Sequence, residues 1–164
     1  MPSVIAAVIV SLRLFNISSA PPSVIDDAQR ALMRIYAAID VDVRWTEDAS
    51  APMVIVRDEE PGDLRRAWQP VLGAAIHTPK GSPVAYVFYR RVVDQAIRHD
   101  ATTASVLASA MAHEVGHLLL PTPNHSHDGL MRGCWDAQEF QRASTGDLRF
   151  SAGEGAQIRA SIGR

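Results

Sequence analysis

The chain contains a single cysteine, Cys134, among its 164 residues. One thiol cannot form an intrachain disulfide, and it cannot supply the several thiolates of a structural zinc cluster. Any metal site in this chain must therefore be built from histidines and carboxylates.

An excess of positive charge is also missing. Lysine and arginine together number 16 against 18 aspartates and glutamates, which gives a formal net charge of −2. A nucleic-acid-binding domain needs a basic footprint, and the pair Arg90 and Arg91 is too small to provide one. We therefore expect no nucleic-acid partner.

The sequence has no long hydrophobic run. Its start, MPSVIAAVIVSLRLFN, is apolar for about ten residues, whereas a membrane-spanning helix needs roughly 20. The start also lacks the basic region that opens a signal peptide. We predict no transmembrane segment and interpret this stretch as a strand in preference to a signal segment. A secreted and a cytoplasmic location both stay open.

Length and composition indicate one folded domain over residues 1–164. Hydrophobic residues make up 47% and charged residues 21%, which is typical of a globular chain of this size. We find no internal repeat and no composition shift that would mark a second domain.

The hydrophobic pattern indicates both strands and helices. Alternating or β-branched runs predict strands at 8–15, 41–45, 53–56, 71–77 and 84–89. Helical spacing predicts a helix that opens at 21–23, one from Asp100 or Thr103 to Pro121, a short one at 135–140, and a last one from Ser151 with the capping-box residue Glu154. Residues 58–70 read as a loop. We expect an α+β fold with a mixed, twisted sheet of about five strands, an N-terminal helix, an active-site helix and a C-terminal helix.

The segment HEVGH at 113–117 carries the clearest chemistry. Positions i and i+4 of a helix lie one turn apart on one face, so His113 and His117 can direct two imidazoles at one metal ion. Glu114 is offset around the helix, where it can reach a water on the metal. This pattern is typical of a catalytic Zn²⁺ site in which the glutamate is the general base.

The sequence offers four candidates for a third ligand. Pro121 and Pro123 end the helix and let the chain reverse, which makes His125 the preferred ligand, with His127 as its closest rival. Asp128 would be a workable oxygen ligand. Glu139 could serve as the distant glutamate that some zinc peptidases use.

The run HEVGHLLLPTPNHSHDGLMR at 113–132 resembles small bacterial metzincin-like predicted peptidases, in which an HExGHLLL helix leads to an N-x-H-S segment and a G-[IL]-M-R turn. The resemblance extends over most of the chain and implies a metzincin-like catalytic domain. It implies His113, His117 and His125 as zinc ligands, Glu114 as the base and Met131 as the Met-turn residue. The longer pattern of the metzincin clan, H-E-x-x-H-x-x-G-x-x-H, would place a glycine at position 120 and a histidine at position 123. This chain has Leu120 and Pro123 there.

Two glycines predict close approaches between segments. Gly116, inside the helix, costs stability relative to alanine and suggests that another segment packs against it. Gly73, Ala74 and Ala75 resemble the small-residue edge strand to which such peptidases add their substrate. We accordingly expect these three residues to hold an extended peptide.

The leading hypothesis is thus a zinc-dependent endopeptidase that binds a peptide or protein substrate and acts as a monomer. One alternative is a proteolytically inactive, zinc-stabilised module that binds a peptide or protein. Another is a different zinc hydrolase, such as an amidase, because fold and metal chemistry alone do not choose the substrate.

Overall fold

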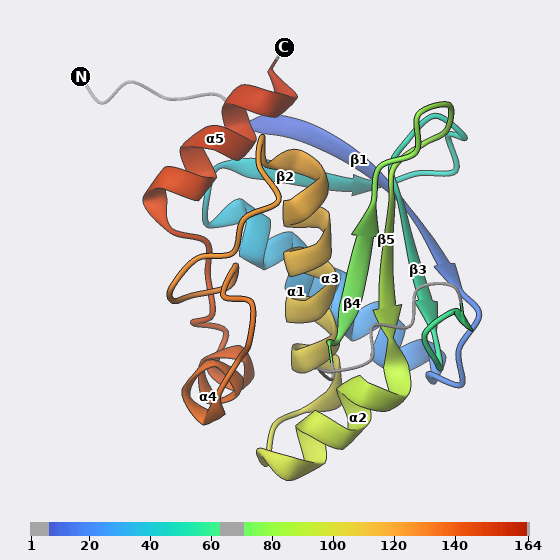
Figure 1. The fold of residues 1–164 in the computed structure, drawn as a ribbon, viewed down its shortest axis with the longest axis vertical. Helices are drawn as coiled ribbons and strands as arrows, with labels where there is room; N and C mark the ends of the chain where they lie inside the picture. Colours follow the sequence, from blue (N-terminus) through green and yellow to red (C-terminus); the bar gives the residue numbers. More distant parts are fainter. Residues whose placement is uncertain (1–6, 63–70, 164) are drawn as a thin grey trace.

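A computed structural model describes residues 7–62 and 71–163 of the chain (Figure 1). In chain order the elements are β1 (Val8–Asn16), α1 (Pro22–Ala37), β2 (Val41–Trp45), β3 (Met53–Arg57), β4 (Gly73–Ile76), β5 (Val84–Phe88), α2 (Tyr89–Arg98), α3 (Thr103–Leu119), α4 (Ala137–Thr145) and α5 (Ala152–Ile162). These residues form an α+β fold, as the sequence predicted.

The five described strands make one mixed sheet in the order β2-β1-β3-β5-β4. Strands β2, β1, β3 and β5 run parallel, and β4 pairs antiparallel with β5. β4 therefore lies at the edge of the sheet, which confirms the edge position that its small residues predicted.

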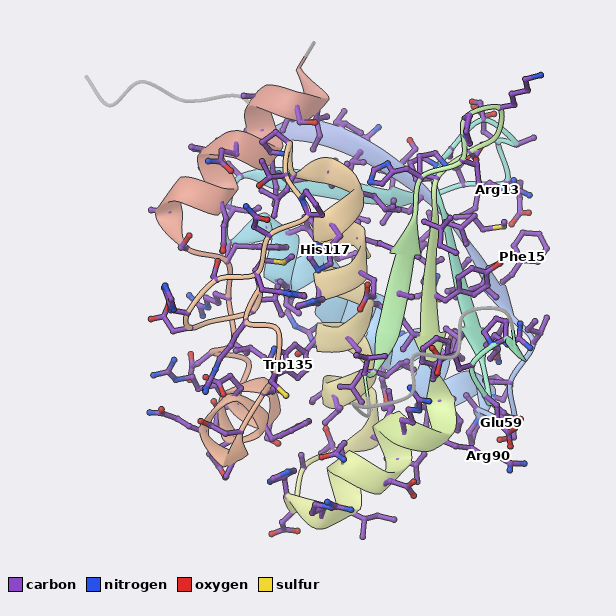
Figure 2. All side chains as sticks on the ribbon, in the orientation of Figure 1. Arg13, Phe15, Glu59, Arg90, His117 and Trp135 are labelled. Carbon is purple, nitrogen blue, oxygen red and sulfur yellow. The ribbon has the colours of Figure 1, made fainter. Side chains whose placement is uncertain are left out.

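Helices α1 and α3 cover one face of the sheet (Figure 1). The buried residues of α1 recur with helical spacing, at Ile25, Ala28, Leu32, Ile35 and Tyr36. Arg13 and Phe15 of β1 project from the other face, where the Arg13 guanidinium lies 5.1 Å from the centre of the Phe15 ring (Figure 2). The hydrophobic core consequently lies between the helices and the inner face of the sheet.

Helix α3 is the central helix of the core. Every residue from Val106 to Gly116 is buried. At its start the Thr102 hydroxyl accepts a hydrogen bond from the Ser105 backbone N–H at 3.3 Å. At its end Leu120 takes an extended conformation with ψ 146°, because Pro121 disfavours helical geometry in the residue that precedes it. The chain leaves the helix soon after His117.

The observed elements differ from the predicted ones in several places. α2 was not predicted, although its buried residues Tyr89, Val92 and Ala96 have helical spacing. α4 begins at Ala137, two residues later than predicted. Asp136 is its N-cap residue and forms a capping box with Glu139 in the first turn. β4 is shorter than the predicted strand. Residues 1–6 and 63–70 lie outside the described residues, and with them lie the first part of the predicted N-terminal segment and most of the predicted 58–70 loop.

None of the helices in the described ranges combines the length and apolarity needed to cross a membrane.

Candidate metal centre

Two histidines of α3 meet on one face of the helix, in the cleft between α3 and β4. His113 and His117 are one turn apart, and their Nε2 atoms are separated by 3.1 Å. His113 is buried, whereas His117 is only partly covered. Helical spacing alone brings these two nitrogens together, as the sequence predicted.

The chain then turns at Pro121 and Pro123 and brings His125 back to the helix. The Nε2 atom of His125 lies 3.1 Å from that of His117. The ligating nitrogens of all three histidines lie within 4.8 Å of one another, which makes them the one group of this kind in the part of the chain that the structure describes. Figure 2 shows His117 on α3 and Trp135 on the loop that runs beside this helix.

The other candidate ligands lie outside this group. Ser126 forms an isolated bridge with Arg132, and the chain bends directly after it, so that His127 and Asp128 are exposed and apart from the cluster. Glu139 is buried at the start of α4, where its carboxylate accepts from the Asp136 backbone N–H at 2.9 Å and from Arg132 Nη1 at 2.7 Å. Of the four candidates, the geometry brings only His125 to the pair on α3.

A backbone carbonyl sets the tautomer of His113. Leu130 O accepts a hydrogen bond from His113 Nδ1 at 2.7 Å, and it also accepts from Trp135 Nε1 at 3.2 Å. With its proton on Nδ1, neutral His113 keeps the Nε2 lone pair free for a metal ion. The sequence does not reveal this contact, because a backbone carbonyl oxygen has no sequence signature.

Met131 packs against α3 at Gly116 and is completely buried. A Cβ atom on Gly116 would lie 2.8 Å from Met131 Sδ and 3.0 Å from Phe150 Cε1. The predicted close approach at Gly116 is confirmed, and the approaching segment is the one that carries Met131.

Gly133 closes the cluster from the side of His125. A Cβ atom at this position would lie 2.9 Å from both Cγ and Nδ1 of the His125 ring. Gly133 was not among the predicted site residues, although a glycine can signal a close approach between segments.

Burial keeps the histidines neutral. It lowers the pKa of His113 to about 3 and that of His117 to about 4, and it lowers the pKa of His125 as well. The hydrogen bond from His113 to Leu130 acts in the opposite direction but is the smaller effect. Near pH 7 the three imidazoles can therefore act as neutral metal ligands.

Glu114 points from α3 toward the edge strand. It is 7% exposed, and burial raises the pKa of its carboxyl group to about 8. A Cβ atom on Gly73 would overlap the backbone O of Tyr86 in β5, and it would lie 2.6 Å from Glu114 Cγ and 2.9 Å from Glu114 Oε1. The close approach of the β5 backbone and of Glu114 together explains why a residue without a side chain stands at this position of β4.

A cleft with a volume of about 330 Å³ contains these groups. Residues 71–76, which include β4, form one wall, and His113, Glu114 and His117 line the cleft from α3. His125 and residues 132–135 form the facing wall. The three histidines and the carboxylate consequently share one solvent-accessible space.

The outer edge of β4 pairs with none of the strands that the structure describes. Phe88 N donates to Leu72 O at 2.8 Å, so Leu72, Ala74 and Ile76 direct their backbone groups at β5 in the alternating antiparallel pattern. The backbone groups of Gly73 and Ala75 point the other way, and no other described strand pairs with this edge. A peptide could extend the sheet here.

Neither a protein-family profile nor a curated protein matches the sequence. A chain of the solved structure described as the "GM1 bound form of the ECX AB5 holotoxin" is similar in fold. The TM-score is 0.52, the match covers 94% of this chain and 80% of that chain, and the sequence identity is 10%. At this identity the likeness shows the fold alone.

Proposed function

We propose that the chain is a zinc-dependent endopeptidase in which His113, His117 and His125 hold the metal and Glu114 is the general base. The observation that carries the proposal is the convergence of three imidazole nitrogens beside the buried Glu114 carboxylate, in a cleft bounded by an open strand edge.

The donor set fits zinc. Neutral imidazoles are preferred ligands of Zn²⁺, and nitrogen atoms about 2.0 to 2.1 Å from a tetrahedral ion lie about 3.3 Å from one another. Two of the three nitrogen pairs in this cluster are separated by 3.1 Å. With three protein ligands, Zn²⁺ lowers the pKa of a water molecule at its fourth position to about 7 and polarises a carbonyl group.

Glu114 carries the proton transfers. It takes the proton of the attacking water and returns it to the leaving amine when the peptide bond breaks. Burial alone favours its protonated form, but a divalent cation beside the carboxylate favours the ionised form that a base needs. The glutamate is therefore suited to its task only in the metal-loaded protein.

The open edge of β4 aligns the substrate. An extended peptide that pairs with the backbone groups of Gly73 and Ala75 gains affinity from main-chain hydrogen bonds, which do not depend on its side chains. The contact of Gly73 with Glu114 brings this strand next to the base. The scissile bond is thereby held within reach of Glu114.

This arrangement favours an enzyme over a zinc-stabilised binding module. A structural zinc site closes all four coordination positions with protein groups. The described residues offer three, and the neighbouring acidic group is a glutamate in an accessible cleft.

The proposal is tested by incubating the purified protein with a peptide library, with and without a chelator, after its zinc content is measured by elemental analysis. We expect one zinc per chain and cleavage that the chelator abolishes and added zinc restores. Glu114→Gln should keep its zinc and lose about 10²- to 10⁴-fold in turnover, because the general base is removed and the ligands are not.

An exposed carboxylate that is remote from the cleft provides the matched control. Glu47→Gln should leave both zinc content and turnover unchanged. A protein that contains no zinc would refute the metal site, and unaltered turnover in Glu114→Gln would refute the assignment of the base.

A further inference from the structure

The segment that carries His125 is tied to the C-terminal helix through one hydrogen bond. Ser126, the next residue along the chain, donates from its hydroxyl to Glu154 Oε1 on the first turn of α5. The other carboxylate oxygen of Glu154 accepts from the Ser151 backbone N–H at 2.7 Å. One carboxylate thus caps α5 and holds the histidine segment at the same time.

Helix α5 has its own attachment to the rest of the molecule. Arg159 Nη1 donates to Ile39 O at 2.8 Å, and a Cβ atom on Gly155 would lie 2.8 Å from Ile39 Cγ2. These contacts dock α5 against the turn between α1 and β2. Glu154 therefore presents its carboxylate from an element whose position does not depend on the histidine cluster.

His125 is the histidine that most needs such support. His113 and His117 belong to a buried helix, whereas His125 lies on an exposed segment outside any helix or strand. The backbone of Ser126 is held from one direction, since its N–H donates to Met131 O at 2.9 Å. The hydroxyl bond to Glu154 holds the same residue from a second direction.

We infer that Glu154 is a positioning residue for His125 and acts through the hydroxyl of Ser126. The inference rests on the proposed metal site and assigns to α5 a part in the geometry of that site. A hydroxyl that donates to a carboxylate makes a charge-assisted bond, which is stronger than a neutral one. Loss of this bond frees the segment beside the ligand while leaving all three ligands in place.

The decisive variant is Ser126→Ala, which removes the hydroxyl and leaves the capping box of α5 intact. Zinc affinity is measured by competition with a chromophoric chelator, and the visible spectrum of the cobalt-substituted protein reports the coordination geometry. We expect affinity to fall about tenfold or more, as is typical when an outer-shell partner of a ligand is lost, together with an altered cobalt spectrum. Ser126→Thr keeps a hydroxyl and should restore both.

Ser151→Ala is the matched control. It removes the hydroxyl that accepts from Glu154 N at 3.2 Å, and so weakens the same helix start without touching Ser126. Its zinc affinity should stay within about twofold of the wild type. An equal loss in Ser151→Ala and Ser126→Ala would overturn the inference, because a general weakening of α5 would then explain both.

A double-mutant cycle tests whether Ser126 and Glu154 act through one bond. The affinity of Ser126→Ala with Glu154→Ala should equal that of Glu154→Ala alone. Independent, additive losses would overturn the inference, as would wild-type affinity in Ser126→Ala. Absence of zinc binding by the wild-type chain would overturn the inference and the proposed function together, and so is distinguishable from a failure of the positioning alone.

Discussion

At the scale of single residues, the three histidines are held by different kinds of contact. His113 donates to a backbone carbonyl, His117 lies on the last turns of a helix, and His125 packs against the backbone of Gly133. Among the described residues, a backbone hydrogen bond sets the tautomer of His113 alone of the three. The contribution of each proposed ligand to metal affinity should therefore depend on how well its segment is anchored, and we expect His125 to be the most sensitive of the three.

The assignment of the third ligand can be tested with two alanine variants. His125→Ala removes an imidazole from the cluster, and we expect zinc affinity to fall about 100-fold or more. His127→Ala is the matched control, because this histidine is exposed and outside the cluster, and its affinity should stay within about twofold. Competition titration measures both, and a larger loss in His127→Ala would contradict the assignment.

The sequence predicted the part of the site that depends on local geometry. His113, Glu114 and His117 belong to one helix, so their spacing alone places them. The choice of His125 over His127 depends on the bridge between Ser126 and Arg132 and on the bend after it, which are tertiary features. The sequence favoured His125 over His127 as the third ligand, but it could not show which of the two lies near the pair on α3.

At the scale of elements, α3 is both the core helix and the carrier of the candidate ligands. The segment of Met131 can pack against it only because position 116 has no side chain. A glycine that lowers the intrinsic stability of the helix is therefore required by the close packing of Met131 and Phe150 against α3.

Glycine lowers the stability of a helix, but at position 116 it also makes room for a packing contact. We therefore expect opposite effects from two glycine-to-alanine changes. Gly153→Ala in α5 meets no atom within 4 Å and should raise the free energy of unfolding by up to about 1 kcal/mol, the usual gain of alanine in a helix. Gly116→Ala should lower it by about 1 to 3 kcal/mol, because the new methyl group overlaps Met131 and Phe150.

Urea unfolding in the presence of a chelator measures both changes without a contribution from metal binding. Equal stabilisation by the two alanines would show that Met131 and Phe150 can move aside, and would contradict close packing at position 116.

The elements themselves were predictable to different degrees. The alternating strands and the capped helix at Ser151 follow from local patterns, and the structure contains them. α2 was missed because it follows β5 without a turn signal, and its start, Tyr89, fits a strand pattern equally well. The edge position of β4 could be expected from its small residues, but its antiparallel pairing with β5 and the strand order of the sheet depend on long-range packing.

At the scale of the whole molecule, the cluster imposes a pH dependence on the stability of the metal-free protein. Burial lowers the pKa values of His113 and His117 from 6.5 to about 3 and about 4, and it lowers that of His125 too. The same burial raises the pKa of Glu114 from 4.5 to about 8. The folded chain therefore prefers neutral histidines and a neutral glutamate, whereas the unfolded chain has no such preference.

The histidines and Glu114 change the pH dependence of stability in opposite directions, and their contributions to its slope cancel near pH 6.5. Between about pH 4.5 and 6.5, the histidines are protonated in the unfolded chain and neutral in the folded chain. These protons outnumber the one proton that Glu114 holds only in the folded chain. The unfolded chain therefore binds more protons, and stability rises with pH. Between about pH 7 and 8, the histidines are largely neutral in both states, and Glu114 binds a proton in the folded chain alone, so stability falls. We expect urea midpoints measured in chelator to peak near pH 6.5, with the falling limb absent in Glu114→Gln. A difference between wild type and Glu114→Gln that stayed constant from pH 6.5 to 8 would show that the Glu114 carboxyl is not held protonated by burial against Gly73.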